Sequence, residues 1–449
     1  MKTKKIGNNK GFALIAVMLY TLLITGFLTA FFIVVVGGYK QAQRTTDSLR
    51  AYYVADAGLS HAFLKLKAVT GALPTSKSLD IPTTSYSVRP GGLAGSYTVS
   101  FSDDGAPWRT YTMTSVGTFG TTTKTLTLKV KLVSLARWNY LSNSEITSKW
   151  GTLWWITNMY SEGPVHTNGQ FNIMGSPVFN GPVSQSSATI NYGQGGPPKD
   201  NPDFQGGLSL GASNIFFPTT EIISNVQTAA QTGGLSLSAK DPKKPGTTTI
   251  ELLSNGTMNV TNTKLSWNKK NMAIPANGAL YVQDENVEVK GTLKGQMTIA
   301  SNKDVLVSGN IRYNTDQMLH NTDPAKNPAS TDMLGLVASN NVSVKEGVSG
   351  ALRIDAYIVA LTQSFNLQCY LNDHSAGGNQ GDMLQFGGLT NNTCGPTGVM
   401  DSKGKITDGY NQLQYYDARF QDSAPPWFPA ARESNNGRYI YVKTKFTES

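Results

Sequence analysis

The chain has 449 residues, of which only 15% are charged, and glycine accounts for 45 of them. This length predicts two or three domains, and the low charge with many Ser, Thr and Asn residues argues against a cytosolic helical enzyme and favours an exported protein rich in strands. The net charge of +9 includes four leader lysines; without them 34 Lys and Arg face 29 Asp and Glu, so polyanion binding is permitted but not required.

The first predicted element is a long apolar helix behind a basic leader. The leader carries four lysines and no acid, and Gly11 to Tyr39 contain no charged side chain. As a helix, residues 12–38 span about 40 Å, more than the roughly 30 Å of a bilayer's hydrocarbon core, and they are too long for a cleaved secretory signal. The lysines predict a single-pass span of the inner (cytoplasmic) membrane with a cytoplasmic N-terminus. A plain membrane anchor is the alternative.

The helical pattern continues beyond the apolar stretch. Within residues 39–69, apolar side chains recur at helical spacing at Leu49, Tyr52, Leu59, Phe63 and Leu66. Such a helix can reside in a bilayer with its first half and pack beneath a globular head with its second. The pattern predicts one helix over residues 12–72.

The junction between leader and helix reads Lys10-Gly11-Phe12-Ala13-Leu14-Ile15-Ala16. It resembles the processing site of type IV prepilins. The resemblance implies that a prepilin peptidase removes residues 1–11 by cutting between Gly11 and Phe12, and that the new N-terminal Phe12 is methylated. The implied partners are this peptidase and the other pilins of a filament.

The second half of the helix contains Leu49-Arg50-Ala51-Tyr52-Tyr53-Val54-Ala55-Asp56-Ala57-Gly58-Leu59. Its small residues, acidic position and glycine resemble the helix of PilX-type minor pilins, over about residues 5–70. Major pilins carry a glutamate five residues into the mature chain, paired with a neighbour's N-terminal amine, where this chain has Ala16. Because a buried carboxylate is costly without a partner, Ala16 fits a subunit at the filament tip. Alternatively, Ala16 indicates a protein that is not a pilin.

A small antiparallel sheet is predicted within residues 73–137. Polar residues alternate with apolar or β-branched ones at 96–101, 109–116 and 121–133, and Asp103-Asp104-Gly105 is a turn signal between the first two. We expect the sheet to pack on the helix as a pilin-like head. One face of its last strand is formed by Leu126, Leu128, Val130 and Leu132.

Short repeats follow Trp138. Asn286-Val287-Glu288-Val289 is echoed at 304–307, 341–344 and, more loosely, 364–367. The gaps of 18, 37 and 23 residues predict one, two and one coils of a β-solenoid, with two side chains of each V-x-V inside and Asn or Asp at the corner. A two-sheet sandwich is the alternative. Residues 206–262 have weak periodicity and predict loops or an insertion.

Two further segments carry a resemblance. They are Gly163-Pro164-Val165-His166-Thr167-Asn168-Gly169 and the tail Tyr416-Asp417-Ala418-Arg419-Phe420 followed by Pro425-Pro426-Trp427-Phe428-Pro429. Both resemble an uncharacterised domain that follows PilX-type N-termini. The arrangement is also similar to ComZ-like minor pilins, in which a pilin carries a large β-solenoid and is implicated in DNA uptake.

The two cysteines, Cys369 and Cys394, lie outside the apolar segment. In an oxidising compartment we expect them to form a disulfide, which would stabilise the fold by about 3 kcal/mol in the chain-entropy model. Two free buried thiols are the alternative.

No arrangement of residues predicts catalysis, a metal site or a cofactor. The histidines are scattered without ligand spacing, at His61, His166, His320 and His374. The carboxylates that a glycan-cleaving solenoid would cluster are dispersed, at Asp304, Asp316, Asp323, Asp332 and Asp355. We therefore expect a non-enzymatic protein, with a polysaccharide-cleaving enzyme as the lesser alternative.

A strand predicted at residues 438–446 contains candidate nucleic-acid contacts, namely Arg438, Tyr439, Tyr441, Lys443 and Lys445. Aromatic rings can stack on bases while ammonium groups meet phosphates. An ordinary edge strand with a solvated face is the alternative.

Together these features predict an α+β protein with a leader (1–11), a pilin helix (12–72), a pilin-like sheet (73–137) and a large all-β domain, a right-handed β-solenoid (138–449). The expected function is that of a minor pilin at or near the tip of a type IV pilus-like filament on the cell surface. It would act in pilus initiation, adhesion or DNA uptake, with extracellular DNA or a surface ligand as the partner of the head. The alternative is a membrane-anchored envelope protein with an adhesive solenoid.

Overall fold

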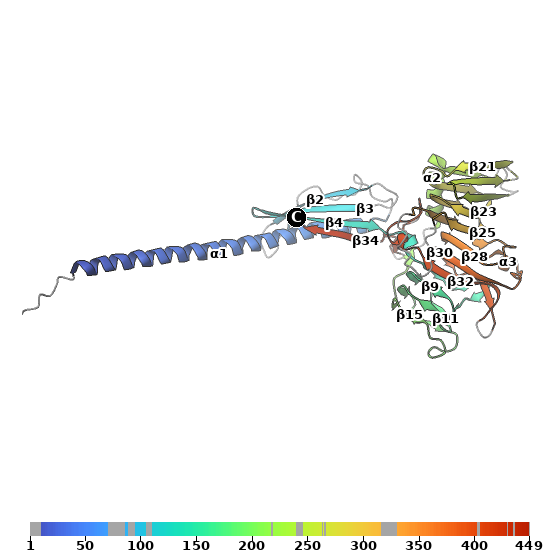
Figure 1. Ribbon diagram of the computed structural model, residues 1–449, viewed down its shortest axis with the longest axis horizontal. Helices are drawn as coiled ribbons and strands as arrows, with labels where there is room; N and C mark the ends of the chain where they lie inside the picture. The colour runs from blue at the N-terminus through green and yellow to red at the C-terminus, as the bar shows by residue number, and fades with distance from the viewer. Residues whose placement is uncertain are drawn as a thin grey trace, which may run out of the picture.

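The computed structural model describes residues 10–70, 86–88, 95–104, 110–216, 219–238, 246–262, 264, 266–315, 330–401, 405–428, 430–433 and 436–448. The molecule is elongated (Figure 1): the helix α1 (Lys10–Lys67) projects from one end, a small sheet lies along its second half, and a large β domain lies beyond that sheet. The expected α+β fold, with a long N-terminal helix, a small antiparallel sheet and a predominantly β C-terminal domain, is confirmed.

The small sheet is antiparallel and has five strands in the order β1-β2-β3-β4-β34. Their bounds are β1 (Tyr86–Val88), β2 (Gly95–Asp103), β3 (Thr110–Phe119), β4 (Thr122–Leu132) and β34 (Tyr441–Glu448). The three strands predicted from alternation are β2, β3 and β4. The predicted face of β4 is buried, because Leu126, Leu128, Val130 and Leu132 are at most 5% exposed. Gly105 of the predicted turn lies outside the described residues.

The fifth strand of this sheet comes from the C-terminal end of the chain. β34 pairs with β4 and places Tyr441 opposite Leu132. Residues 441–448, which the sequence-based boundary 138–449 placed in the solenoid, therefore belong to the small sheet. The large domain is inserted between two neighbouring strands of the small sheet.

The large domain is a stack of coils whose strands pair mainly in parallel. Its N-terminal part contains β5 (Tyr140–Ser144), β8 (Trp155–Ile156), β9 (Tyr160–Ser161), β10 (Val165–Thr167), β11 (Asn172–Met174), β12 (Val178–Phe179), β13 (Val183–Gln185), β14 (Asn191–Tyr192), β15 (Asp203–Phe204) and β16 (Leu208–Leu210). Short antiparallel pairs are formed by β6 (Ile146–Thr147) with β7 (Gly151–Thr152) and by β17 (Ile215–Phe216) with β33 (Arg432–Glu433).

The C-terminal part of the stack has longer strands. They are β18 (Leu235–Ser238), β19 (Thr247–Leu253), β20 (Thr257–Asn262), β21 (Trp267–Ala273), β22 (Ala279–Gln283), β23 (Asn286–Leu293), β24 (Gln296–Ser301), β25 (Val305–Tyr313), β26 (Met333–Ala338), β27 (Val342–Val344), β28 (Leu352–Ala360), β29 (Phe365–Leu367), β30 (Asn379–Thr393), β31 (Gly398–Met400) and β32 (Ile406–Tyr416). Helices α2 (Thr219–Gly233) and α3 (Gln368–Leu371) and the 3₁₀ turns η2 (Leu135–Arg137) and η4 (Ala418–Gln421) complete the domain.

The V-x-V repeats pair with one another in parallel. Val287 lies opposite Val305, Val305 opposite Val342, and Val342 opposite Phe365. The repeats are therefore successive rows of one face, as predicted. The interval of 37 residues is one coil, however, and the prediction of two coils there is wrong. That coil is long because it includes residues 316–329, which lie outside the described part of the chain.

The chain enters the stack in its middle. β5 pairs in parallel with β10 on one side and with β30 on the other. The first coils run from β5 outward through β10, β13 and β16. The chain then continues from α2 and β18 and coils back through β22, β24, β26 and β28 to β30. The two halves of the stack thus meet at β5 and β30.

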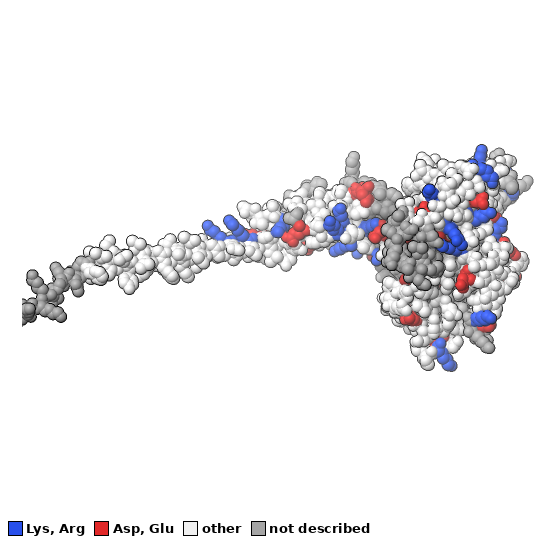
Figure 2. All heavy atoms as spheres, in the orientation of Figure 1, with Lys and Arg blue, Asp and Glu red and all other residues white. Residues whose placement is uncertain are grey.

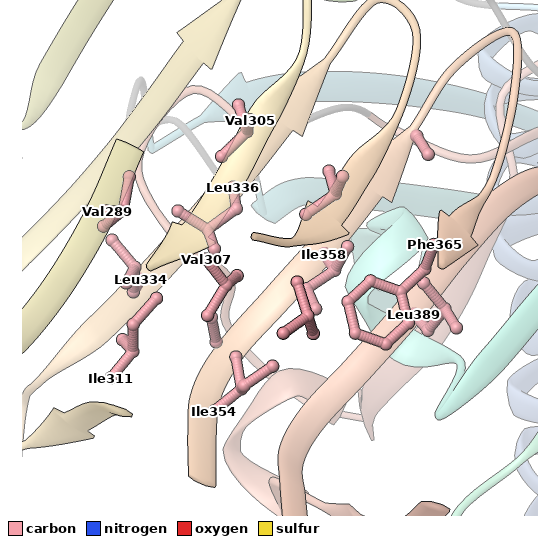
Figure 3. Packing of buried hydrophobic residues seen from close by; sticks show 14 of the residues in the cluster. Val289, Val305, Val307, Ile311, Leu334, Leu336, Ile354, Ile358, Phe365 and Leu389 are labelled. Carbon is pink, nitrogen blue, oxygen red and sulfur yellow. The ribbon is translucent and has the colours of Figure 1, made fainter. Parts of the chain in front are cut away.

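The interior of the stack is largely apolar. Figure 3 shows Val305, Val307, Leu336, Ile354 and neighbouring side chains pointing toward one another between the faces of the coils. Each of these four is 0% exposed. Burying such side chains stabilises a fold by about 1.5–3 kcal/mol each.

A second apolar layer covers the outer face of the main sheet. Helix α2 packs there with Ile222, Val226 and Ala230, and the C-terminal tail adds Phe420 and Phe428. The prediction that residues 206–262 are only loops or an insertion is wrong, since this interval contains α2 and strands β18 to β20. The exposed side of α2 is polar, so the average hydrophobicity of the helix is low and does not reveal the single apolar stripe.

Candidate functional site: the N-terminal helix and the sheet it supports

The first half of α1 is apolar on every side and has no packing partner among the described residues. Phe12 is 78% exposed, Leu22 73% and Phe27 76%. The helix is long and apolar enough to cross a membrane. Figure 2 shows this half without Lys, Arg, Asp or Glu, and the charges begin farther along the helix. A soluble protein rarely exposes so large an apolar surface, so this half is built for contact with lipid or with other apolar helices.

The threonine hydroxyls in this half are satisfied within the helix. The hydroxyls of Thr21, Thr25 and Thr29 donate to the carbonyl oxygens of Val17, Thr21 and Thr25, at 3.0, 2.7 and 2.7 Å. An unpaired hydroxyl is costly in hydrocarbon. These bonds therefore remove the main obstacle that the threonines pose to a membrane or a filament core.

The second half of α1 lies close against the small sheet because the contact residues are small. Ala51, Ala55 and Ala62 are at most 1% exposed. A Cβ at Gly117 of β3 would lie 2.3 Å from the backbone nitrogen of Ala55 and 2.4 Å from the carbonyl oxygen of Ala51. Of the predicted apolar stripe, Leu59 and Leu66 are buried, whereas Leu49 is 53% exposed and faces away from the sheet. The alternation of small residues is what allows the close helix–sheet packing.

A polar contact also joins the helix to the sheet near its end. Nδ1 of His61 lies 2.8 Å from the hydroxyl oxygen of Tyr97 in β2. His61 is thus a packed helix residue, as expected.

The predicted processing junction lies at the start of α1. Gly11 and Phe12 are helical, and Ala16 lies one turn farther along, half-buried by its own neighbours. Residues 1–9 of the leader lie outside the described residues. Cleavage, methylation and the role of Ala16 remain predictions.

The predicted nucleic-acid strand does not present all five of its side chains. Tyr439 is 3% exposed, and the guanidinium carbon of Arg432 lies 4.3 Å from its ring centroid. Tyr441 is half-buried and packs edge-on against Tyr111, with ring centroids 5.9 Å apart. Neither ring is therefore free to stack on a base. Arg438, Lys443 and Lys445 are exposed. The ammonium of Lys443 lies 5.2 Å from the ring centroid of Phe63 in α1.

The predicted disulfide is not formed in the structure, where Cys369 and Cys394 are both free. Cys369 is buried in α3, and burial raises the pKa of its thiol. Cys394 lies beside Tyr140 and Glu145, and burial, followed by the nearby Glu145, raises the pKa of its thiol. Both cysteines belong to the apolar core of the coil stack, Cys369 within it and Cys394 packed against it.

The carboxylates that the structure describes hold the coil backbone. Asp304 accepts from the backbone N–H of Asn341, Asp332 from that of Gly295, and Asp355 from that of Tyr313. Asp316 and Asp323 lie outside the described residues, as does His320. Within the described ranges, no group of three or more His, Cys, Asp and Glu side chains could hold a metal ion.

The remaining histidines also have structural partners. Nδ1 of His166 lies 2.8 Å from Oγ of Ser184 on the next coil, and burial lowers the pKa of this imidazole. Nδ1 of His374 lies 2.6 Å from Oε1 of Glu346 on the surface. His166 therefore belongs to the coil structure, where it lies in strand β10.

Sequence reasoning missed two features of this arrangement. One is the pairing of β34 with β4 in the small sheet, which no local sequence pattern predicts. The other is a cavity at the meeting point of β5 and β30, described below, whose lining residues come from segments far apart in the chain.

Comparison with known proteins gives limited matches. A family model described as a domain of unknown function (DUF4900) matches residues 104–188, a range that runs from the small sheet into the first coils. No curated protein matches the chain. Among solved structures, the chain is similar to the competence-associated pilin ComZ from Thermus thermophilus, at 12% sequence identity and a TM-score of 0.38, over 90% of this chain and 98% of that one.

Proposed function

We propose that this protein is a pilin-like filament subunit, held first in the inner membrane by α1 and then assembled into a type IV pilus-like filament that displays the large β domain. The observation that carries the proposal is the division of α1 into two halves. The first is apolar on all sides and exposed, and the second is fastened to a sheet by Ala51, Ala55 and Gly117. One continuous helix therefore serves as membrane anchor, filament contact and support for the head.

The position within the filament is proposed from Ala16. A repeating subunit can pair a buried carboxylate there with a neighbour's amine, whereas a subunit without a neighbour ahead of it gains nothing from the charge. We place this protein at or near the tip, in pilus initiation or surface adhesion. A role with DNA would rest on the exposed Arg438, Lys443 and Lys445 alone, because Tyr439 is buried.

The test is mass spectrometry of the N-terminal peptide from sheared surface filaments and from membranes. We expect a peptide that starts at N-methylated Phe12 in the filament fraction. In a Gly11→Leu variant the bulky side chain should block cleavage and keep the protein in membranes. Gly26→Ala is the matched control, because the space around a Cβ at Gly26 is open.

An intact leader found in membranes only would overturn the proposal and favour an anchored envelope protein. The tip position has its own readout. Gold-labelled antibodies against the large domain should mark filament ends, and labelling along the whole shaft would contradict it.

A further inference from the structure

A cavity of about 150 Å³ lies where the two halves of the coil stack meet. Its walls come from β5 and β8 in the first half and from β30, β31 and β32 in the second. The rings of Trp154 and Tyr410 and the amides of Asn391 and Gln412 are among its lining. The chain supplies these residues from segments far apart in the sequence, so the cavity exists only because the coils join at this point.

Asn391 has an unusual position in this lining. It lies in register with Ala360 of β28 on one side and with Ser142 of β5 on the other. The row has Ala338 and Ala360 next to the junction on one side and becomes polar at Asn391, continuing through Ser142 and Thr167. This change of polarity inside a core coincides with the cavity.

The amide of Asn391 has no hydrogen-bond partner in the described part of the chain, although the residue is only 1% exposed. Neither its nitrogen nor its oxygen is paired. Leaving a buried polar group unpaired is costly, because the group has given up its hydrogen bonds to water. A ligand in the cavity that both donates and accepts hydrogen bonds would remove that cost.

The remaining polar groups of the cavity are fixed in place. The hydroxyl of Tyr140 donates to Glu145 at 3.1 Å, and the hydroxyl of Ser142 also donates to that carboxyl group. Burial raises the pKa of Glu145. A carboxyl group that accepts from two hydroxyl groups supplies a preorganised polar wall.

The charge of the lining decides the class of ligand. Among the described residues that line the cavity there is no Lys or Arg, and Glu145 is the only acid. Anions such as phosphates or nucleic acids therefore have no partner here. Aromatic rings beside amides suit a molecule with an apolar face and a rim of hydroxyl groups. With one water needing roughly 10–15 Å³ of such space, the cavity holds on the order of ten waters, which matches one sugar ring better than a chain of them.

We propose that this cavity binds a single neutral pyranose ring, with Trp154 against the face of the ring and Asn391 paired to its hydroxyl groups. The site gives the displayed domain a receptor for an uncharged sugar. Sugar binding at this cavity does not involve the N-terminal helix, so it can be tested independently of the proposed filament role.

Binding without cleavage is what this lining supports. Most glycosidases use two carboxyl groups on either side of the scissile bond. Glu145 has no second carboxyl group beside it among the described lining residues. A bound sugar should accordingly leave unchanged.

The experiment uses the full chain in a detergent without a sugar headgroup, titrated with D-glucose, D-galactose and N-acetyl-D-glucosamine and followed by calorimetry. We expect saturable binding of at least one of them. Asn391→Leu and Trp154→Ala should each weaken it about tenfold or more. Trp267→Ala is the matched control, since Trp267 is half-buried in β21 and does not line the cavity.

Asn391→Leu separates binding from folding. Removing an unpaired amide should leave the unfolding temperature unchanged or raise it, so lost binding in this variant would reflect the site itself. A trisaccharide of the bound sugar then distinguishes the source: binding indicates the end of a glycan, and exclusion indicates a free sugar. The proposal is overturned if none of the three sugars binds saturably, or if both cavity variants bind as tightly as the parent protein.

Discussion

The carboxylate of Asp304 accepts a hydrogen bond from the backbone N–H of Asn341 on the next coil, at 3.0 Å. The same relationship recurs on both sides. Oδ1 of Asn286 accepts from the N–H of Asp304 at 3.3 Å, and Oδ1 of Asn341 accepts from the N–H of Ser364 at 3.4 Å. Each corner side chain therefore fixes the backbone of the coil that follows, which explains why Asn and Asp stand before the V-x-V repeats.

We expect Asp304→Ala to destabilise the large domain by about 1–3 kcal/mol, because the N–H of Asn341 loses its acceptor at a half-buried corner. Urea unfolding of the full chain in detergent measures this as a lower midpoint. Asp422→Ala is the control, since its side chain is 85% exposed. Equal urea midpoints for the two variants would show that the hydrogen bond from Asn341 to Asp304 contributes nothing to stability.

The core between the coils gives a second prediction. Leu336 is 0% exposed and lies among Val307, Ile358 and their neighbours (Figure 3). Leu336→Ala should cost about 2–5 kcal/mol of unfolding free energy, because it leaves a cavity in a close-packed interior. Leu208→Ala, at a position 39% exposed, should cost much less. Similar losses in calorimetric unfolding would contradict the assignment of Leu336 to the core.

The helix–sheet contact can be probed at Gly117. Gly117→Ala inserts a Cβ 2.3–2.4 Å from backbone atoms of α1, which cannot move aside as a flexible side chain would. Overpacking of this kind costs about 1–3 kcal/mol, and hydrogen exchange in α1 and β3 should rise. Gly309→Ala, with its nearest neighbour 3.6 Å away, is the control. Unchanged exchange in the Gly117→Ala variant would mean that the helix is not held by this contact.

The environment of Asp408 leads us to expect that the stability of the folded protein depends on pH. Burial works to raise its pKa, but hydrogen bonds from the Ser375 hydroxyl, the backbone N–H groups of Ala376 and Gly378, and the Tyr370 hydroxyl outweigh this and lower it. A carboxyl group whose folded pKa is lowered adds stability that is complete above the unfolded value of about 3.9 and is lost as the pH falls through the folded value.

We therefore expect Asp408→Asn to be less stable than the parent at pH 7, because the amide cannot accept all four bonds. The difference should shrink as the pH falls below about 4. Urea midpoints between pH 7 and 3 measure it, with Asp422→Asn as the control. A difference that stays constant over this range would show that the charge of Asp408 is not what the four donors stabilise.

Local patterns in the sequence predicted local structure well. Leu126 to Leu132 alternate because one face of β4 is buried, and the V-x-V repeats recur because each coil returns to the same row of the core. In both cases alternate residues of a short strand face the same apolar core, so the local sequence is enough to predict which side chains are buried.

Long-range features could not be predicted in the same way. Strands β5 and β30 pair only because the chain enters the stack in its middle. The sequence around Tyr140 and the sequence around Asn391 do not predict this pairing. The predicted Cys369–Cys394 bond failed for the same reason, since compartment and composition do not say which coil faces which. The interval of 37 residues was predicted to be two coils but is one, because a single coil can contain extra residues.

The insertion of the large domain between β4 and β34 determines how the molecule carries a mechanical load. Both connections leave the small sheet at the same end, where Leu132 and Tyr441 face each other, and they are joined by hydrogen bonds between Val133 and Ile440 and between Ala431 and Val133. A pull on the outer domain therefore enters the small sheet through two neighbouring strands at one end. The share carried by β34 passes to β4 through their pairing, and the share carried by β4 passes along the chain to the rest of the sheet and to α1.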